Sequence, residues 1–249
     1  MHILVLVIVS FDKPVYYDML QVWRERVCSR SDVWFIQCKP ASEWIGDVIN
    51  DILDTSLKDR FELDIANKTL FIRGDECLIP GILHKTVEAL SFFLLEEGSN
   101  SRQAAPLGMS AAVPFIWRTN LSSVRDFAGL QRYLGTMNSS GFYGGYIGLG
   151  SLNNGSSTFF ASGAGFLMSR DVAEYLVLNK QFLRWDLIDD VAIGALLEPK
   201  FSIVPIERCW IQSGEEVVGS DGVFHYRCES YQHLRTVEFM QYVVRGLSK

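Results

Sequence analysis

Short runs of consecutive apolar residues recur along the chain, and a stretch with apolar residues at helical spacing separates the first two. The runs at residues 3–9, 33–36 and 69–72 are typical of strands that are buried on both faces of a sheet. Between the first two runs, apolar side chains in residues 16–23 have the spacing of one helix face. The chain therefore opens with a predicted β-α-β unit, whose strands should be parallel.

The same alternation continues to the end of the chain and predicts an α/β fold. We expect a Rossmann-like mixed sheet, mainly parallel in its N-terminal half and flanked by helices. Further strands are predicted at residues 113–118, 159–168 and 201–206, and helices at 80–95, 124–134, 169–178, 187–197 and 236–245, with a helix and a loop in 47–61.

Two polar stretches interrupt the pattern. Residues 96–109 are predicted to form a mobile loop. Residues 138–157 are dense in Gly, Ser and Asn, which indicates either a flexible flap or tight turns where the backbone approaches a ligand. Neither stretch resembles an interdomain linker, so we expect a single domain over residues 1–249.

The net charge and the cysteine content indicate which binding partners and which cellular compartment to expect. The net charge of −6 argues against a nucleic-acid partner. The apolar residues 1–11 are too few to span a bilayer and lack signal-peptide features, so no transmembrane segment is predicted. The five cysteines have no paired spacing, which favours a reducing, cytoplasmic location, although one disulfide stays open as an alternative. The Asn-X-Ser/Thr sequences are therefore expected to be unmodified.

The most informative stretch joins the strand at 69–72 to the helix that begins near Pro80. Asp75 and Glu76 lie between them, at the carboxyl end of the predicted strand. Open α/β sheets bind their ligands at this edge, so the two carboxylates are candidate ligand contacts. A polar turn without a ligand is the alternative interpretation.

Four motifs in this order resemble one enzyme family. They are GDECLIP at 74–80, FFASGAGFLMSRDVAEYL at 159–176, IDDVAIG at 188–194 and Phe-His at 224–225. Together they resemble GT-A glycosyltransferases of the fringe and β-1,3-galactosyl- and N-acetylglucosaminyltransferase type. The resemblance covers most of the chain, with clear motifs in three places.

The resemblance implies a metal-dependent, inverting transfer of a sugar. The donor would be a nucleotide-sugar, a UDP-sugar in particular, and the acceptor a glycan or glycoprotein. Residues 1–95 would form the nucleotide-binding half and residues 110–249 the acceptor-binding half. Mn²⁺ or Mg²⁺ would offset the charge of the leaving diphosphate.

The resemblance also assigns the metal ligands, with one departure. The family motif has three aspartates, whereas this chain has Gly74, Asp75 and Glu76, so Glu76 takes the metal-binding position. Asp75 would bind the metal through water or hold the ribose, and His225 would be a further ligand. Gly74 leaves the geometry and the metal preference open. A strand histidine bonded to a backbone carbonyl is the alternative for His225.

By the same analogy, Asp190 is the expected general base, with Asp189 as the next candidate. An acceptor hydroxyl needs a carboxylate to take its proton as the new C–O bond forms. The start of the helix at 187–197 would keep such a carboxylate ionised. The alternative is that both aspartates only cap the helix.

The remaining expected contacts are with the donor, and for each a packing role is the alternative. A polar run at residues 118–123 is expected to bond the donor or the acceptor, or to cap a helix. The loop after the first strand would hold the base and ribose, the glycine-rich turn the sugar, and one of two arginines the phosphates. These candidates are Ser10, Asp12 and Tyr16 for the nucleoside, Gly163, Ala164 and Gly165 for the sugar, and Arg227 or Arg73 for the phosphates.

Two other functions stay open. The first is an inactive GT-A-fold module that only binds a sugar or nucleotide, which the loss of a carboxylate at Gly74 favours. The second is a nucleotidyltransferase, which also uses paired carboxylates. Against it, the segment after Val9 has no glycine- and lysine-rich phosphate loop.

Overall fold

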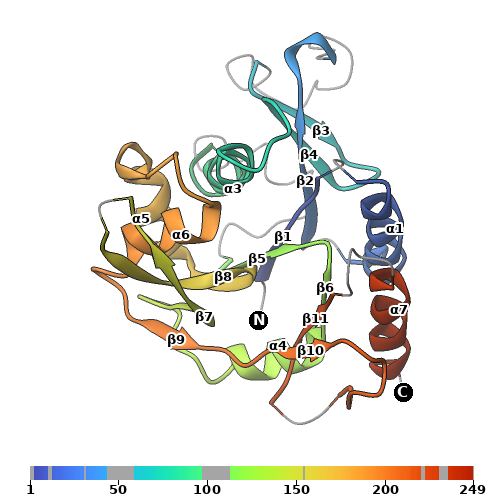
Figure 1. Cartoon of the computed structure of the whole chain (residues 1–249). Coiled ribbons are helices and arrows are strands. Elements are labelled where there is room, and N and C mark those ends of the chain that lie inside the picture. The colour runs from blue at the N-terminus through green and yellow to red at the C-terminus, as the bar shows by residue number, and fades with distance from the viewer. Residues whose placement is uncertain are drawn as a thin grey trace.

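A computed structural model describes residues 3–10, 13–30, 32–43, 59–96, 113–153, 155–219, 222–229 and 235–248. Within these ranges an eight-stranded sheet has the strand order β3-β4-β2-β1-β5-β8-β7-β9 (Figure 1). Its strands are β1 (Ile3–Ile8), β2 (Val33–Lys39), β3 (Phe61–Asp64), β4 (Thr69–Arg73), β5 (Phe115–Asn120), β7 (Tyr143–Ser151), β8 (Ser157–Ser169) and β9 (Ile203–Pro205).

Helices cover both faces of this sheet. The described helices are α1 (Val15–Val27), α3 (Gly81–Ser91), α4 (Phe127–Leu134), α5 (Arg170–Leu178), α6 (Asp189–Leu197) and α7 (Thr236–Gly246), with the short helices η1 (Ala41–Glu43), η2 (Phe92–Glu96) and η5 (Lys180–Phe182).

The strand directions confirm the expected fold class. β1 pairs in parallel with β2 and with β5, and β2 pairs in parallel with β4. β3 and β8 are antiparallel to their neighbours β4 and β5. The sheet is therefore mixed, and its N-terminal half is mainly parallel.

The unbroken apolar run of β1 is explained by two cores on opposite faces of the sheet. Leu4 and Leu6 pack into the core that lies under α3, α5 and α6. Val5 and Val7 pack into the core that lies under α1, α4 and α7. Figure 1 shows α1 and α7 on one side of the sheet and α3 on the other. Because successive strand residues point to opposite faces, every position of β1 is buried and must be apolar.

A second, three-stranded sheet brings the C-terminal segment next to the end of β5. It has the order β10-β11-β6, with β6 (Ser123–Arg125), β10 (Cys209–Ile211) and β11 (His225–Cys228). The short turn between β5 and β6 is tied to α1, since Trp23 Nε1 donates a hydrogen bond to the Leu121 carbonyl at 2.9 Å.

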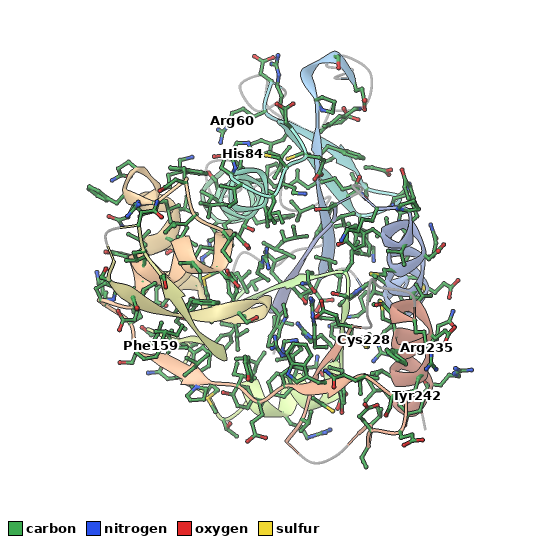
Figure 2. All side chains as sticks on the ribbon, viewed as in Figure 1. Arg60, His84, Phe159, Cys228, Arg235 and Tyr242 are labelled. Carbon is green, nitrogen blue, oxygen red and sulfur yellow. The ribbon has the colours of Figure 1, made fainter. Side chains whose placement is uncertain are left out.

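Two sequence predictions differ from the structure. Nine of the twenty residues 138–157 form the strand β7, which pairs with β8, and glycine is needed there for packing: a Cβ at Gly150 would lie 2.8 Å from Val191. The strand predicted at residues 159–168 is confirmed as part of β8, and the glycine-rich turn that the family resemblance implied at 162–165 lies inside this strand. The pair ends in an exposed apolar edge, where Figure 2 shows Phe159 at the periphery of the molecule.

Several expectations concern residues that the structure does not describe. The loop at 97–109 and the segment 47–58 lie outside the described residues.

The five cysteines are all free thiols, so no disulfide joins any two of them. No described helix combines the length and the apolar character that crossing a bilayer requires.

The loop after β10 is closed by one carboxylate. Glu216 accepts backbone N–H bonds from Gln212, Ser213 and Gly214 at 2.8–2.9 Å, and Tyr242 on α7 donates to its carbonyl (Figure 2). Burial alone would raise the pKa of Glu216, but these N–H donors outweigh it and lower the pKa to about 2. The ionised carboxylate is therefore the form that the folded loop binds.

We expect Glu216→Gln to destabilise the protein by about 1 kcal/mol at neutral pH, after a discount for solvent screening. The folded pKa lies below the unfolded one, so this contribution is complete above the unfolded pKa and is lost as the pH falls toward about 2. Urea unfolding of the variant and of the native protein between pH 7 and pH 3 measures it. The exposed neighbour Glu215, as Glu215→Gln, is the control, and an equal pH dependence in both variants would contradict the prediction.

Candidate functional site

A cavity of about 550 Å³ lies at the carboxyl ends of the parallel strands. Its lining includes Ser10 after β1, Glu76 after β4 and Asn120 at the end of β5. From β1 the chain builds β2 and β4 on one side, and it then returns to place β5 on the other side of β1. The cavity is therefore at the point where the strand order reverses, which is where open α/β sheets bind ligands.

The cavity lining combines charged and aromatic side chains from distant parts of the chain. Carboxylates, guanidinium groups and aromatic rings face the same space. They are Glu76, Asp189, Asp190 and Glu229; Arg118, Arg208 and Arg227; and Tyr16 and Trp210.

At the start of α6, the buried Asp189 is paired with an arginine. The Arg118 Nη2 group of β5 donates to Asp189 Oδ2, and Arg118 Nη1 donates to the Gly163 carbonyl of β8. This ion pair is almost fully buried, so each charge is compensated locally. Asp189 is thus held by an arginine from the neighbouring strand.

Asp190, the next residue, is held by backbone groups instead. Its Oδ2 accepts from the Gly163 N–H at 2.8 Å, and its Oδ1 accepts from the Val191 N–H at 2.9 Å. Burial, followed by the negative charge of Asp189, raises the pKa of Asp190 above its usual value. A carboxylate with a raised pKa at the wall of a cavity is a candidate proton acceptor.

Glu76 is bound to an internal lysine. Lys85 on α3 is fully buried, and its ammonium group lies 2.6 Å from Glu76 Oε2 and 2.6 Å from the Val9 carbonyl oxygen. It also donates to Ser10 Oγ at 3.3 Å, while Glu76 Oε1 accepts from the Cys38 N–H at 2.9 Å. Both oxygens of Glu76 therefore have protein partners.

His225 does not reach the cavity. Its ring is fully buried and meets the Trp117 ring edge to face, with centroids 5.6 Å apart. Burial, followed by the charges of Arg125, Arg208 and Arg227, holds the pKa of His225 well below its usual value. Neither ring nitrogen has a hydrogen-bond partner in the part of the chain that the structure describes, so the alternative of a bond to a backbone carbonyl is not met among these residues either.

The residues assigned to a divalent cation do not fit one in this arrangement. Asp75 is exposed and does not line the cavity, Glu76 is paired with Lys85, and His225 is buried elsewhere. In the described ranges, no three His, Cys, Asp or Glu side chains are placed to hold a metal ion together. The requirement for Mn²⁺ or Mg²⁺ stays a prediction, and the described residues do not provide a set of ligands for either ion.

The expected donor contacts divide into three groups. Arg73 is exposed at the end of β4, and Gly165 packs on buried side chains, so neither lines the cavity. Asp12 lies outside the described residues. The cavity does bring together Ser10, Tyr16, Gly163, Ala164 and Arg227.

Sequence reasoning named the polar run at 118–123 as contacts of the donor or the acceptor, and Arg118 and Asn120 of this run do line the cavity. It missed two other polar side chains of the site. Lys85 lies in a helix that is buried on nearly all sides, where a lysine is itself unusual. Arg208 lies between the short strands β9 and β10 and carries no motif.

Comparison with known proteins establishes no family. No family model matches the chain, and no curated protein does. One solved structure that matches is the inositol-1-phosphate CTP transferase from T. maritima, at 13% sequence identity, with 99% of this chain and 97% of that chain covered and a TM-score of 0.46. A structural similarity this weak says nothing about the function of this chain. These comparisons also do not support the resemblance to glycosyltransferases of the fringe type.

The two glycines of β8, Gly163 and Gly165, have different surroundings: Gly165 packs against buried side chains, whereas Gly163 borders the cavity. A Cβ at Gly165 would collide with the buried Arg125 guanidinium and lie 3.0 Å from the Trp117 and His225 rings. A Cβ at Gly163 would lie 3.1 Å from Arg118 Nη1, beside the cavity.

We therefore expect Gly165→Ala to destabilise the protein by about 1–3 kcal/mol, because rigid buried rings cannot move aside. Gly163→Ala, the matched control on the same strand, should lose clearly less. Denaturant unfolding of both variants measures the difference, and equal losses would show that the neighbours of Gly165 can move.

Proposed function

We propose that the chain is a transferase that binds a nucleotide-linked sugar in this cavity and passes the sugar to a hydroxyl of a glycan or glycoprotein. The observation that carries the proposal is Asp190, a carboxylate of raised pKa at the wall of the switch-point cavity. A hydroxyl acceptor requires such a base, and a nucleotide requires such a crevice.

In the proposed reaction, Asp190 takes the proton of the acceptor hydroxyl while the hydroxyl oxygen bonds to the anomeric carbon of the sugar. The bond between that carbon and the diphosphate oxygen breaks, and its electron pair leaves with the nucleoside diphosphate. Displacement in one step inverts the anomeric carbon and needs no enzyme nucleophile. The negative charge of Asp189 supports the base, because it favours the protonated form of Asp190.

The nucleoside would bind at the end of β1. Ser10 and Tyr16 line the cavity there, and an aromatic ring can stack on a base. Lys85 bonds both Val9 and Ser10, so it holds this end of the strand in one position. The donor would thus lie across the carboxyl ends of β1 and β5.

A nucleotidyltransferase is a second candidate, favoured by the three arginines of the cavity, which would also suit a triphosphate. The leaving group separates the two functions. A sugar transferase releases nucleoside diphosphate from a nucleotide-sugar, whereas a nucleotidyltransferase releases pyrophosphate from a nucleoside triphosphate and a sugar phosphate. Assays of both products over a panel of substrates decide between them, and release of neither favours a binding module.

We expect Asp190→Asn to lower transfer, or hydrolysis of the donor, by about 10²–10⁴-fold, because the amide cannot take a proton. Release of nucleoside diphosphate is the measurement, and circular dichroism checks the fold. Asp186→Asn is the matched control, since Asp186 lies on the preceding segment and does not line the cavity. Full activity of Asp190→Asn would remove this residue from the mechanism.

The pH profile gives an independent test. Activity should fall as the pH drops through the raised pKa of Asp190, because the base becomes protonated. Asp189→Asn removes a neighbouring negative charge and leaves Arg118 uncompensated, and both effects lower the pKa of Asp190. In kcat/KM profiles the acidic limb of this variant should move to lower pH, whereas an unmoved or raised limb would contradict the assignment.

A further inference from the structure

One wall of the cavity carries an arginine that has no ion-pair partner among the described residues. Arg208 lies between β9 and β10, and its guanidinium group is sandwiched between the rings of Tyr146 and Trp210, 4.2 Å from each centroid. Its Nη1 donates to Ser162 Oγ at 3.1 Å, and its buried Nε has no hydrogen-bond partner within the described ranges. In the part of the chain that the structure describes, no carboxylate forms an ion pair with Arg208.

Arg227 of β11 lines the same cavity, and its own hydrogen bonds hold it in place. Its Nη1 donates to Asn120 Oδ1 at 2.8 Å and to Ser122 Oγ at 2.5 Å. Its Nε donates to Glu229 Oε2 at 3.1 Å. These bonds orient the guanidinium plane, and Glu229 supplies one negative charge to this wall.

A third arginine lies behind the wall. Arg125 is fully buried, and the hydrogen bonds that it donates within the described residues all reach neutral oxygens, among them Thr119 Oγ1 at 2.7 Å and the Ala164 carbonyl at 3.2 Å. Burial, followed by the charges of Arg208 and Arg227, lowers the pKa of Arg125 well below its usual value. Among the described residues, Glu229 is the only carboxylate that forms an ion pair with any of these three guanidinium groups, which is an unfavourable balance until an anion binds.

The other carboxylates of the cavity compensate this excess of positive charge only in part. Glu76 is paired with Lys85, and Asp189 is paired with Arg118. Asp190, which is held by backbone N–H groups, adds one negative charge when it is ionised. The Lys85 ammonium also fills a position among oxygens of Glu76, Val9 and Ser10. A divalent cation bound to Glu76 would have to displace it.

We propose that Arg208 and Arg227 form an anion site that binds the diphosphate of the nucleotide-linked substrate without a divalent cation. The inference rests on the proposed function and deepens it. Planar guanidinium groups match phosphate oxygens in pairs, and their fixed orientation places positive charge where the leaving diphosphate gains negative charge. The arginines thereby take the role that the sequence motifs suggested for Mn²⁺ or Mg²⁺.

Calorimetric titration with inorganic pyrophosphate, in buffer that contains EDTA, tests the site directly. The native protein should bind, and Arg208→Gln and Arg227→Gln should each weaken the Kd by about tenfold or more, as expected for a lost charge-assisted bond. Arg132→Gln is the matched control, because this arginine of α4 is 72% exposed and does not line the cavity. Its Kd should stay within about twofold of the native value.

Arg208→Gln is the decisive variant, since Arg208 lies on a connecting segment and donates only one side-chain hydrogen bond that the structure records. Arg208→Lys keeps the charge but loses the planar fork, so its Kd should lie between those of the native protein and Arg208→Gln. Pyrophosphate binding that requires Mn²⁺, or equal binding by the native protein and Arg208→Gln, would overturn the proposal.

The titration is independent of sugar transfer. Asp190→Asn should bind pyrophosphate as the native protein does, because Asp190 is assigned to the acceptor proton. If pyrophosphate binds as expected but no nucleotide-sugar is consumed, the anion site stands and the proposed function fails. If a sugar is transferred but pyrophosphate binds only with Mn²⁺, the proposed function stands and the anion site fails.

Discussion

A single buried ammonium group joins the parts of the chain on which the cavity depends. Lys85 reaches from α3 to the end of β1 and to the segment after β4, where it meets Val9, Ser10 and Glu76. A fully buried lysine is costly unless its three donors have partners, and here they bond a carbonyl, a hydroxyl and a carboxylate. Loss of any one partner would leave the charge under-compensated. The carboxyl ends of two strands are therefore held in one relative position.

This interaction also decides how charge is distributed around the cavity. Because Lys85 neutralises Glu76, and Arg118 neutralises Asp189, two of the acidic side chains are already occupied. Asp190 keeps backbone donors and a raised pKa, so it alone in this group has the environment of a base. The positive excess comes from Arg208 and Arg227, which line the same cavity. One cavity thus combines the proposed proton acceptor with the proposed anion site.

Local patterns were sufficient for much of the fold. The β-α-β opening, the helices near Pro80 and Asp189, and the mixed sheet follow from apolar periodicity, which depends only on neighbouring residues. They were insufficient for the part of residues 138–157 that forms β7, because glycine signals both turns and close packing. Only a tertiary neighbour, such as Val191 beside Gly150, shows why glycine occurs inside this strand.

The sequence alone determined the α/β class and the order of the elements, and it named several residues that do meet in the cavity, among them Ser10 and Asp190. It did so because carboxyl ends of parallel strands converge on one edge of a sheet. Only the tertiary structure decided the state of each charge. Lys85 pairs with Glu76, while His225 is buried among arginines far apart in the sequence. Burial and ion pairing depend on three-dimensional neighbours, which no local pattern contains.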